Sequence, residues 1–308
     1  MLKAYSYIEN EQLDSGIVDR QIFDKERQII LEFALNNPTP KMEKNCVFCN
    51  GATKDFATID NVFYQRCKAC FSIFANVDAE LLKRYKAYEP LVDFRSSSEY
   101  QNSAAERRKE IWNDFLFWLE YRVARHLRKT SALDVIDVGN FYNAFSEKVK
   151  KATFCGSYNT AKAADIVLFL DHFRCLADPM DTLVDFWHKL KDDGILVMGV
   201  RVGSGFDIIT LKDRLYSIYP YETLLLPSTE GLSIMLNSSG FDVLEISTPG
   251  TLDVEFVLQN KEFLDESDLF VHYLLNKTDQ SILAEFQRFL QKSGMSSHAR
   301  IIARKRAL

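Results

Sequence analysis

Four cysteines form the pattern with the clearest chemistry in this chain. They occur as Cys46-x-x-Cys49 and Cys67-x-x-Cys70, and seventeen residues separate the two pairs. Two thiols three positions apart can reach the same metal ion, and four thiolates satisfy the tetrahedral coordination that zinc prefers. Because four sulfur ligands leave no open position, we expect a structural zinc site. The competing interpretation is four buried thiols that share this spacing by chance.

The chain between the two pairs must bring them face to face. The segment FATIDNVFYQRC alternates apolar and polar residues, which predicts short strands that return the second pair to the first. Such a small unit has little apolar core, so the metal would supply much of its folding free energy. We therefore predict a zinc ribbon over residues 45–77.

Composition and charge restrict the partners and the compartment. The chain has 308 residues, 47% of them hydrophobic, and a net charge of -5, which argues against nucleic acid and anionic membranes as partners. The first residues lack the apolar segment of a signal peptide, and no run approaches the roughly 20 apolar residues of a membrane span. We expect a cytoplasmic protein, where cysteines serve as ligands or free thiols rather than in disulfides.

Residues 135–145, VIDVGNFYNAF, have the form of a strand followed by a ligand-binding turn. Apolar strands that end near an acid such as Asp137 and a glycine such as Gly139 often lead into glycine-rich turns that hold a nucleoside. Here Asn140 and two aromatic residues follow in place of further small residues. The sequence therefore predicts a cofactor turn in which the usual glycines are missing.

The remainder of the chain predicts the elements that would position these residues. Apolar strands alternate with amphipathic helices, which favours an α/β domain with a mostly parallel sheet covered on both faces. The aromatic-rich helix over 111–127 would serve either as core or as a contact surface. We expect a helical N-terminal extension (1–44), the zinc ribbon (45–77), a helical linker or cap (78–130) and the α/β domain (131–308).

Three later segments, together with the cysteine quartet, carry a family resemblance. They are ADIVLFLDHFRCLADPMDTLVDFWHKLKDDGILVMGV, YPYETLLLPSTEGLSIMLNSSGFDVLEISTPGTLDV and FLQKSGMSSHARIIARK. In this order the sequence resembles bacterial class I S-adenosylmethionine-dependent methyltransferases that have an N-terminal zinc-binding domain. The resemblance implies a Rossmann-like domain, a structural zinc ion, a site for S-adenosylmethionine and a small-molecule acceptor such as a nucleotide-linked deoxysugar.

Measured against that family, the cofactor site departs in several ways. Asp137 and Gly139 match its acid and first glycine, and Asn140 follows them, but Phe141 and Asn143 stand at the next glycine positions. Glycine is needed there because the backbone approaches the cofactor closely. Tyr158 stands where the family has a ribose-binding acid, and one phenol cannot accept two ribose hydroxyls as a carboxylate does.

The connection after this second strand is also short. Only a few residues separate Asn159 from the next strand at Asp165, whereas a helix and an edge strand normally fill this interval. We therefore expect that one βα unit is missing.

The family's proton-transfer histidines are absent as well. The matching positions hold Arg174-Cys175 and Glu222-Thr223. Asp171 and His172 lie one turn earlier and are the remaining candidates for a catalytic base. A histidine near a strand end is more often a hydrogen-bonded structural residue.

Two functions fit these observations. In the first, which we favour, the chain is a methyltransferase-like pseudoenzyme with an eroded cofactor site that acts as a binding or partner subunit, with a small-molecule or nucleotide-sugar ligand, a protein partner or a second copy of itself. In the second, it is an active methyltransferase with an atypical cofactor site. A nucleic-acid-binding ribbon is disfavoured by the charge balance.

Overall fold

The structure is a computed structural model that describes residues 20–41, 44–127, 133–138, 152–154, 163–215, 217–264, 266–277 and 279–307. The helices of eight or more residues are α1 (Arg20–Asn36), α2 (Ala79–Lys86), α3 (Glu89–Ser96), α4 (Ser98–Trp118), α6 (Pro179–Lys189), α8 (Thr229–Ser238), α10 (Leu269–Lys277) and α11 (Gln280–Ser293). Shorter helices and turns are η1 (Leu119–Val123), α5 (Ala124–His126), η3 (Phe173–Cys175), α7 (Phe206–Leu211), η4 (Lys212–Arg214), α9 (Asp253–Gln259), η5 (Lys261–Phe263) and η6 (Glu266–Asp268).

The strands form two sheets. Those of the cysteine unit are β1 (Thr53–Ile59), β2 (Val62–Cys67) and β3 (Ile73–Ala75), which are joined by β8 (Leu225–Leu226). Those of the central sheet are β4 (Leu133–Asp137), β5 (Ala152–Phe154), β6 (Ala164–Leu170), β7 (Leu190–Arg201), β9 (Phe241–Ser247) and β10 (His298–Lys305).

The central sheet confirms the predicted α/β class. Its described strands follow the order β5-β4-β6-β7-β10-β9, and β10 pairs antiparallel with both of its neighbours while the other pairs are parallel. Only residues 155–163 connect β5 to β6. A crossover helix alone needs at least about 10–12 residues, so this connection has no room for the further βα unit that the sequence lacks.

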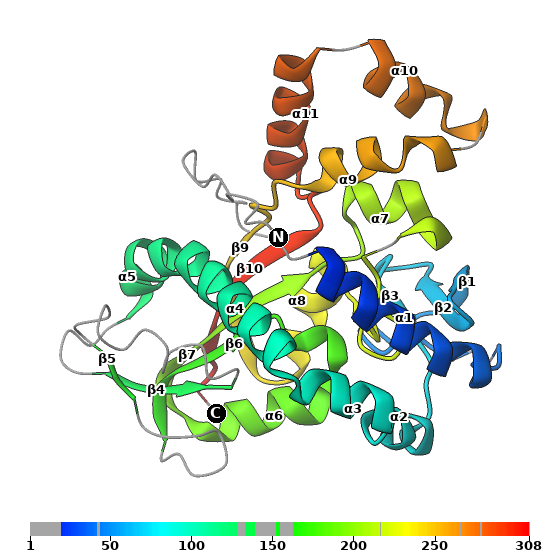
Figure 1. Cartoon of the computed structure of the whole chain (residues 1–308). Coiled ribbons are helices and arrows are strands. Elements are labelled where there is room, and N and C mark those ends of the chain that lie inside the picture. Colours follow the sequence, from blue (N-terminus) through cyan, green and yellow to red (C-terminus); the bar gives the residue numbers. More distant parts are fainter. Residues whose placement is uncertain are drawn as a thin grey trace.

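Each face of the sheet is covered by helices, as alternating burial along the strands requires. Ile166 and Leu168 of β6 pack in one apolar cluster with Phe115 and Trp118 of α4 (Figure 1). Val167 and Phe169, which alternate with them along β6, belong to the other cluster, which also contains side chains of α6 and α8. Phe115 and Trp118, the described aromatic residues of 111–127, are therefore core, and the contact-surface interpretation is wrong for these two.

Glycine at one position allows α4 to lie close to the sheet. A Cβ atom on Gly199 of β7 would come within 2.3 Å of the Phe115 ring. Phe115 is 1% exposed. Residue 199 therefore has to be glycine for α4 to pack as it does.

The cysteine unit is joined to the α/β domain by backbone pairing. Ile73 and Phe74 of β3 pair antiparallel with Leu226 and Leu225 of β8, a strand from the segment between α7 and α8. Residues of both regions belong to one apolar cluster. The four-stranded sheet is thus built from two parts of the chain that are far apart in sequence (Figure 1).

Between β9 and β10 the chain makes a helical excursion. Residues of α9, η5, η6, α10 and α11 fill this interval and project beyond the end of the central sheet (Figure 1). Among the described helices, none has the length and apolar character required to cross a membrane.

Candidate functional site

The four predicted cysteine ligands converge on one point. The Sγ atoms of Cys46 and Cys70 lie 3.6 Å apart, those of Cys49 and Cys67 lie 3.5 Å apart, and all four lie within 4.8 Å of one another. They are free thiols, since a disulfide would place two sulfurs about 2.05 Å apart. This clustering favours the metal-site interpretation over four thiols that share their spacing by chance.

The two cysteine pairs are held by equivalent turns. In the first, Cys46 donates its N–H to the Gly51 carbonyl at 2.9 Å; in the second, Cys67 donates to the Ser72 carbonyl at the same distance. The residue after each pair has a left-handed backbone, with φ of 57° at Asn50 and 62° at Phe71. This conformation lets the chain turn back immediately after the second cysteine.

Backbone N–H groups point at the sulfurs from within the turns. Phe48 donates to Cys46 Sγ at 3.4 Å, and Ala69 donates to Cys67 Sγ at 3.3 Å. The hydrogen bond with Cys46 lowers the pKa of the Cys70 thiol, against the opposing effect of burial, and the same bond raises the pKa of Cys46. The cluster therefore favours at least one thiolate, which is the form that binds metal.

The dimensions of the cluster suit a tetrahedral metal ion. Four sulfurs about 2.3 Å from a central zinc ion lie about 3.8 Å from one another. The shortest separations here, 3.5 and 3.6 Å, are close to that value, and the thiols are mostly buried, with Cys67 at 0% exposure. The donor set and its geometry thus fit a closed metal site.

The hydrogen bonds that link the cysteine cluster to the start of α8 were not apparent from the sequence. Ser72 Oγ lies 3.2 Å from Cys70 Sγ and 3.3 Å from Ser228 Oγ, and Ser228 precedes α8. Serines are common in turns and at helix N-termini, so sequence spacing alone carried no signal for this link across more than 150 residues.

A second candidate site lies at the carboxyl edge of the central sheet, where α/β proteins bind their ligands. Asp137 ends β4 and is 4% exposed, Asp171 follows β6, and Arg201 ends β7. His298 begins the antiparallel β10 directly opposite Arg201. The fold thus places at one edge residues that lie far apart in the sequence. The other predicted cofactor residues, Gly139, Asn140 and Tyr158, lie outside the described residues, as do Phe141 and Asn143.

Asp171 and His172 lie at this edge, as the strand assignment implied. Asp171 has a left-handed backbone, with φ of 58°, and donates its N–H to the Gly199 carbonyl at 2.9 Å. Its carboxylate forms an ion pair with Arg174 at 3.6 Å. Desolvation lowers the pKa of His172, and the negative charge of Asp171 partly opposes this shift. His172 is thus a neutral imidazole near pH 7, the form that can accept a proton.

Glu222, at one of the family's histidine positions, takes part in a network with the N-terminal helices. It accepts a hydrogen bond from Tyr85 at 2.7 Å and forms an ion pair with Arg95, which also pairs with Glu26 of α1 at 2.8 Å. These contacts hold the segment before β8 against α1, α2 and α3. Glu222 therefore has a packing role that is visible in the structure.

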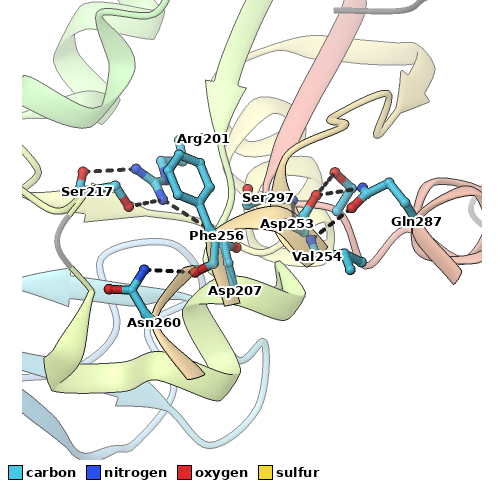
Figure 2. A network of polar contacts seen from close by, with 10 residues as sticks. Arg201, Asp207, Ser217, Asp253, Val254, Phe256, Asn260, Gln287 and Ser297 are labelled. Atoms are coloured by element: carbon cyan, nitrogen blue, oxygen red, sulfur yellow. Dashed lines mark hydrogen bonds and ion pairs between the residues drawn. The ribbon is translucent and has the colours of Figure 1, made fainter. Parts of the chain in front are cut away.

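Beyond Arg201, a buried polar network supports the chain as it leaves β7. Arg201 donates to the Ser217 carbonyl at 2.9 Å and pairs with Asp207 at 3.0 Å (Figure 2). Nearby, Asp253 accepts hydrogen bonds from the N–H of Ser297 at 2.7 Å and from Gln287 at 2.9 Å. Burial raises the pKa of Asp207 to about 6, while Arg201 opposes this shift. These residues were not singled out from the sequence, because only the tertiary fold brings them together.

No protein-family model matches this chain, and no curated protein matches its sequence. Solved structures do align with it. One is a chain from the complex between the Haloferax volcanii Trm112 methyltransferase activator and a methyltransferase, with 13% identity, coverage of 66% of this chain and 96% of that chain, and a TM-score of 0.42.

Two further matches are a Haemonchus contortus phosphoethanolamine N-methyltransferase bound to S-adenosylhomocysteine and the cyclase SpnF. The first has 16% identity, coverage of 70% of this chain and 60% of that chain, and a TM-score of 0.41. The second has 14% identity, coverage of 68% and 84%, and a TM-score of 0.34. Similarities this low support no conclusion about family or activity.

Proposed function

We propose that this chain is a zinc-containing, methyltransferase-like protein without standard methyl-transfer activity, which acts as a binding or partner subunit. The short connection of residues 155–163 after β5 carries this proposal. It leaves no room for the βα unit that, in the family the sequence resembles, precedes the loop that contacts adenine. The sequence departures at Phe141 and Tyr158 concern the same cofactor.

Zinc is the metal that the cysteine cluster suits best. Four thiolates are the usual ligands of a structural zinc ion, and they leave no position for a substrate or a reactive water. Cys46, Cys49, Cys67 and Cys70 would hold the ion, which would stabilise the cysteine unit. Metal analysis of the purified protein should find one zinc per chain; a zinc-free, folded wild-type protein would contradict this assignment.

A second copy of the chain is the partner that the surface favours. Phe270 and Tyr273 of α10 are 72% and 59% exposed, and Phe289 of α11 is 56% exposed. Seven large apolar residues among the described residues between 263 and 295 are exposed, three of them on α10. Contact with the same helix of a second copy would remove the α10 side chains from water.

A homodimer with two-fold symmetry uses the same surface of both copies, so the exposed side chains of α10 in one copy would face those of α10 in the other. Light scattering after gel filtration should therefore report a dimer for the wild type and a monomer for Phe270→Glu; a monomeric wild type at micromolar concentration would contradict the proposal.

The alternative is an active S-adenosylmethionine-dependent methyltransferase on a small molecule such as a nucleotide-linked sugar. The observation in its favour is the carboxyl edge, where Asp137 is retained and buried near Asp171 and His172. S-adenosylmethionine would supply the methyl group, and the protein would contribute mainly by holding the acceptor in line. His172 or Asp171 would accept the acceptor's proton. If turnover exists, unchanged rates in both Asp137→Asn and His172→Ala would remove this role.

Calorimetric titration with S-adenosylmethionine and S-adenosylhomocysteine decides between the two functions. The zinc-loaded protein would be used, and mass spectrometry would search for either compound carried through purification. We expect no detectable binding. Binding at micromolar strength or better would overturn the proposal and direct the search to acceptor sugars.

A further inference from the structure

The N-terminus of α8 lies against the cysteine cluster. Ser228 is the N-cap of this ten-residue helix, and its hydroxyl accepts a hydrogen bond from the Gly231 N–H at 2.9 Å. The Ser228 N–H in turn donates to Ser72 Oγ at 2.9 Å, and the Ser228 hydroxyl donates to the Cys70 carbonyl. A continuous chain of hydrogen bonds therefore runs from the Cys70 sulfur to the first turn of α8.

Gly231 shows how tightly this turn is packed. A Cβ atom at this position would lie 2.1 Å from Ser72 Oγ and 3.1 Å from Cys70 Sγ. Gly231 is buried, and its backbone is helical. Glycine is therefore required here by close approach and not by conformation, at a cost to the helix of up to about 1 kcal/mol relative to alanine.

Opposite charges favour this contact between the cysteine cluster and α8. One zinc ion with four thiolates carries a net charge of -2, and the N-terminus of a helix carries a partial positive charge of about +0.5. Free N–H groups in the first turn of a helix stabilise anions. The partially positive N-terminus of α8 thus lies against a cluster that carries a negative charge when zinc is bound.

We propose that Ser72, Ser228 and the first turn of α8 form the outer layer of the metal centre, so that zinc binding fastens the α/β domain to the cysteine unit. This inference rests on the proposed zinc site. The segment before α8 carries β8, which pairs with β3, and Glu222, which binds Tyr85 and Arg95. Zinc binding therefore stabilises residues 222–231, through hydrogen bonds and strand pairing that connect this segment to the cysteine unit.

Zinc affinity in full-length variants, measured by competition with a chromophoric chelator, tests the proposal. Ser228→Ala should weaken zinc binding by about 10–100-fold, as is typical for partners of metal ligands. Gly231→Ala should weaken it at least as much, because its methyl group displaces Ser72. The matched control is Ser233→Ala, a buried serine of the same helix whose hydroxyl donates to the Thr229 carbonyl at 2.7 Å; its affinity should equal that of the wild type.

Hydrogen exchange provides a readout that does not depend on any activity. Removing zinc from the wild type should raise exchange in residues 223–232 together with residues 46–72, while β6 and β7 remain protected. Wild-type affinity in folded Ser228→Ala, or unchanged exchange in 223–232 without zinc, would overturn the inference. A wild type that binds no zinc would instead refute the zinc assignment itself, and this inference with it.

Discussion

The cysteine unit and the carboxyl edge of the central sheet are built in opposite ways. The four clustered cysteines come from two local turns with the same hydrogen-bond pattern, between residues 46 and 72. The edge residues come from four strands or strand ends, and their positions depend on the whole sheet order. The positions of the cysteines relative to one another therefore depend mainly on local turns, whereas those of the edge residues depend on the arrangement of the strands.

The largest expected effect is removal of one metal ligand. Cys67→Ser should abolish stoichiometric zinc binding, because the remaining three thiols leave the site open, and structural zinc sites contribute on the order of 10 kcal/mol of binding free energy. Metal analysis and limited proteolysis of residues 45–77 would measure this loss. Cys175→Ser, an exposed thiol outside the cluster, should keep full zinc content.

This substitution also tests whether the two regions are separable. Hydrogen exchange in β6 and β7 should stay slow in Cys67→Ser, because these strands lie inside the central sheet and one of their faces packs against Phe115 and Trp118 of α4. Global loss of protection would contradict the contrast between a local metal unit and an independent sheet.

A medium effect on stability is expected from replacing Asp207, the buried carboxylate beside the carboxyl edge of the central sheet. Burial raises the pKa of Asp207 to about 6, against the opposing charge of Arg201 and with a further rise from Asp253. Between pH 4 and 6 the native state then binds more protons than the unfolded state, so this residue lowers stability as pH rises through that window. The free energy of unfolding of Asp207→Asn relative to the wild type should increase by about 2 kcal/mol from pH 4 to pH 7.

Denaturant titrations of both proteins at several pH values would measure this difference. At pH 4 the Asp207 carboxyl of the folded wild type is protonated, so the difference at this pH contains no ion pair with Arg201 and serves as the baseline. A difference that is independent of pH would show that Asp207 is ionised at pH 4. In contrast, zinc content should be equal in the two proteins at pH 7.

The smallest effect concerns two left-handed residues, one in each region. Phe71 is 58% exposed with φ of 62°, and Asp171 has φ of 58° and an ion pair with Arg174. Replacing a non-glycine residue in this conformation by glycine relieves about 1 kcal/mol of strain. Thermal unfolding should therefore show a gain for Phe71→Gly and a smaller gain for Asp171→Gly, which also loses the ion pair. The reverse order would contradict this account.

The sequence predicted those features that are encoded locally. The spacing of the four cysteines predicted that their side chains come together, and the apolar segments DIVLFL and FDVLEIST form β6 and β9. The strand GILVMGV was expected, but β7 begins earlier, at Leu190, because the preceding polar residues also join the extended chain.

Features that depend on distant partners were not predictable. Leu225 and Leu226 carry no strand signal of their own, and they form β8 only because β3 offers a free edge. The position of His298 opposite Arg201 depends on the pairing of β10 with β7. The network of Arg201, Asp207 and Ser217 likewise required the path of the chain after β7.

The pairing of β3 with β8 has a consequence for synthesis on the ribosome. The cysteine unit is complete at residue 75, but the strand that covers its edge is made about 150 residues later, which takes roughly 10–30 s at typical elongation rates. During that interval the Ile73–Ala75 edge is available to other chains. Early zinc capture would then fold a unit with one open edge, and a chain that stops before residue 226 would leave this edge exposed to aggregation.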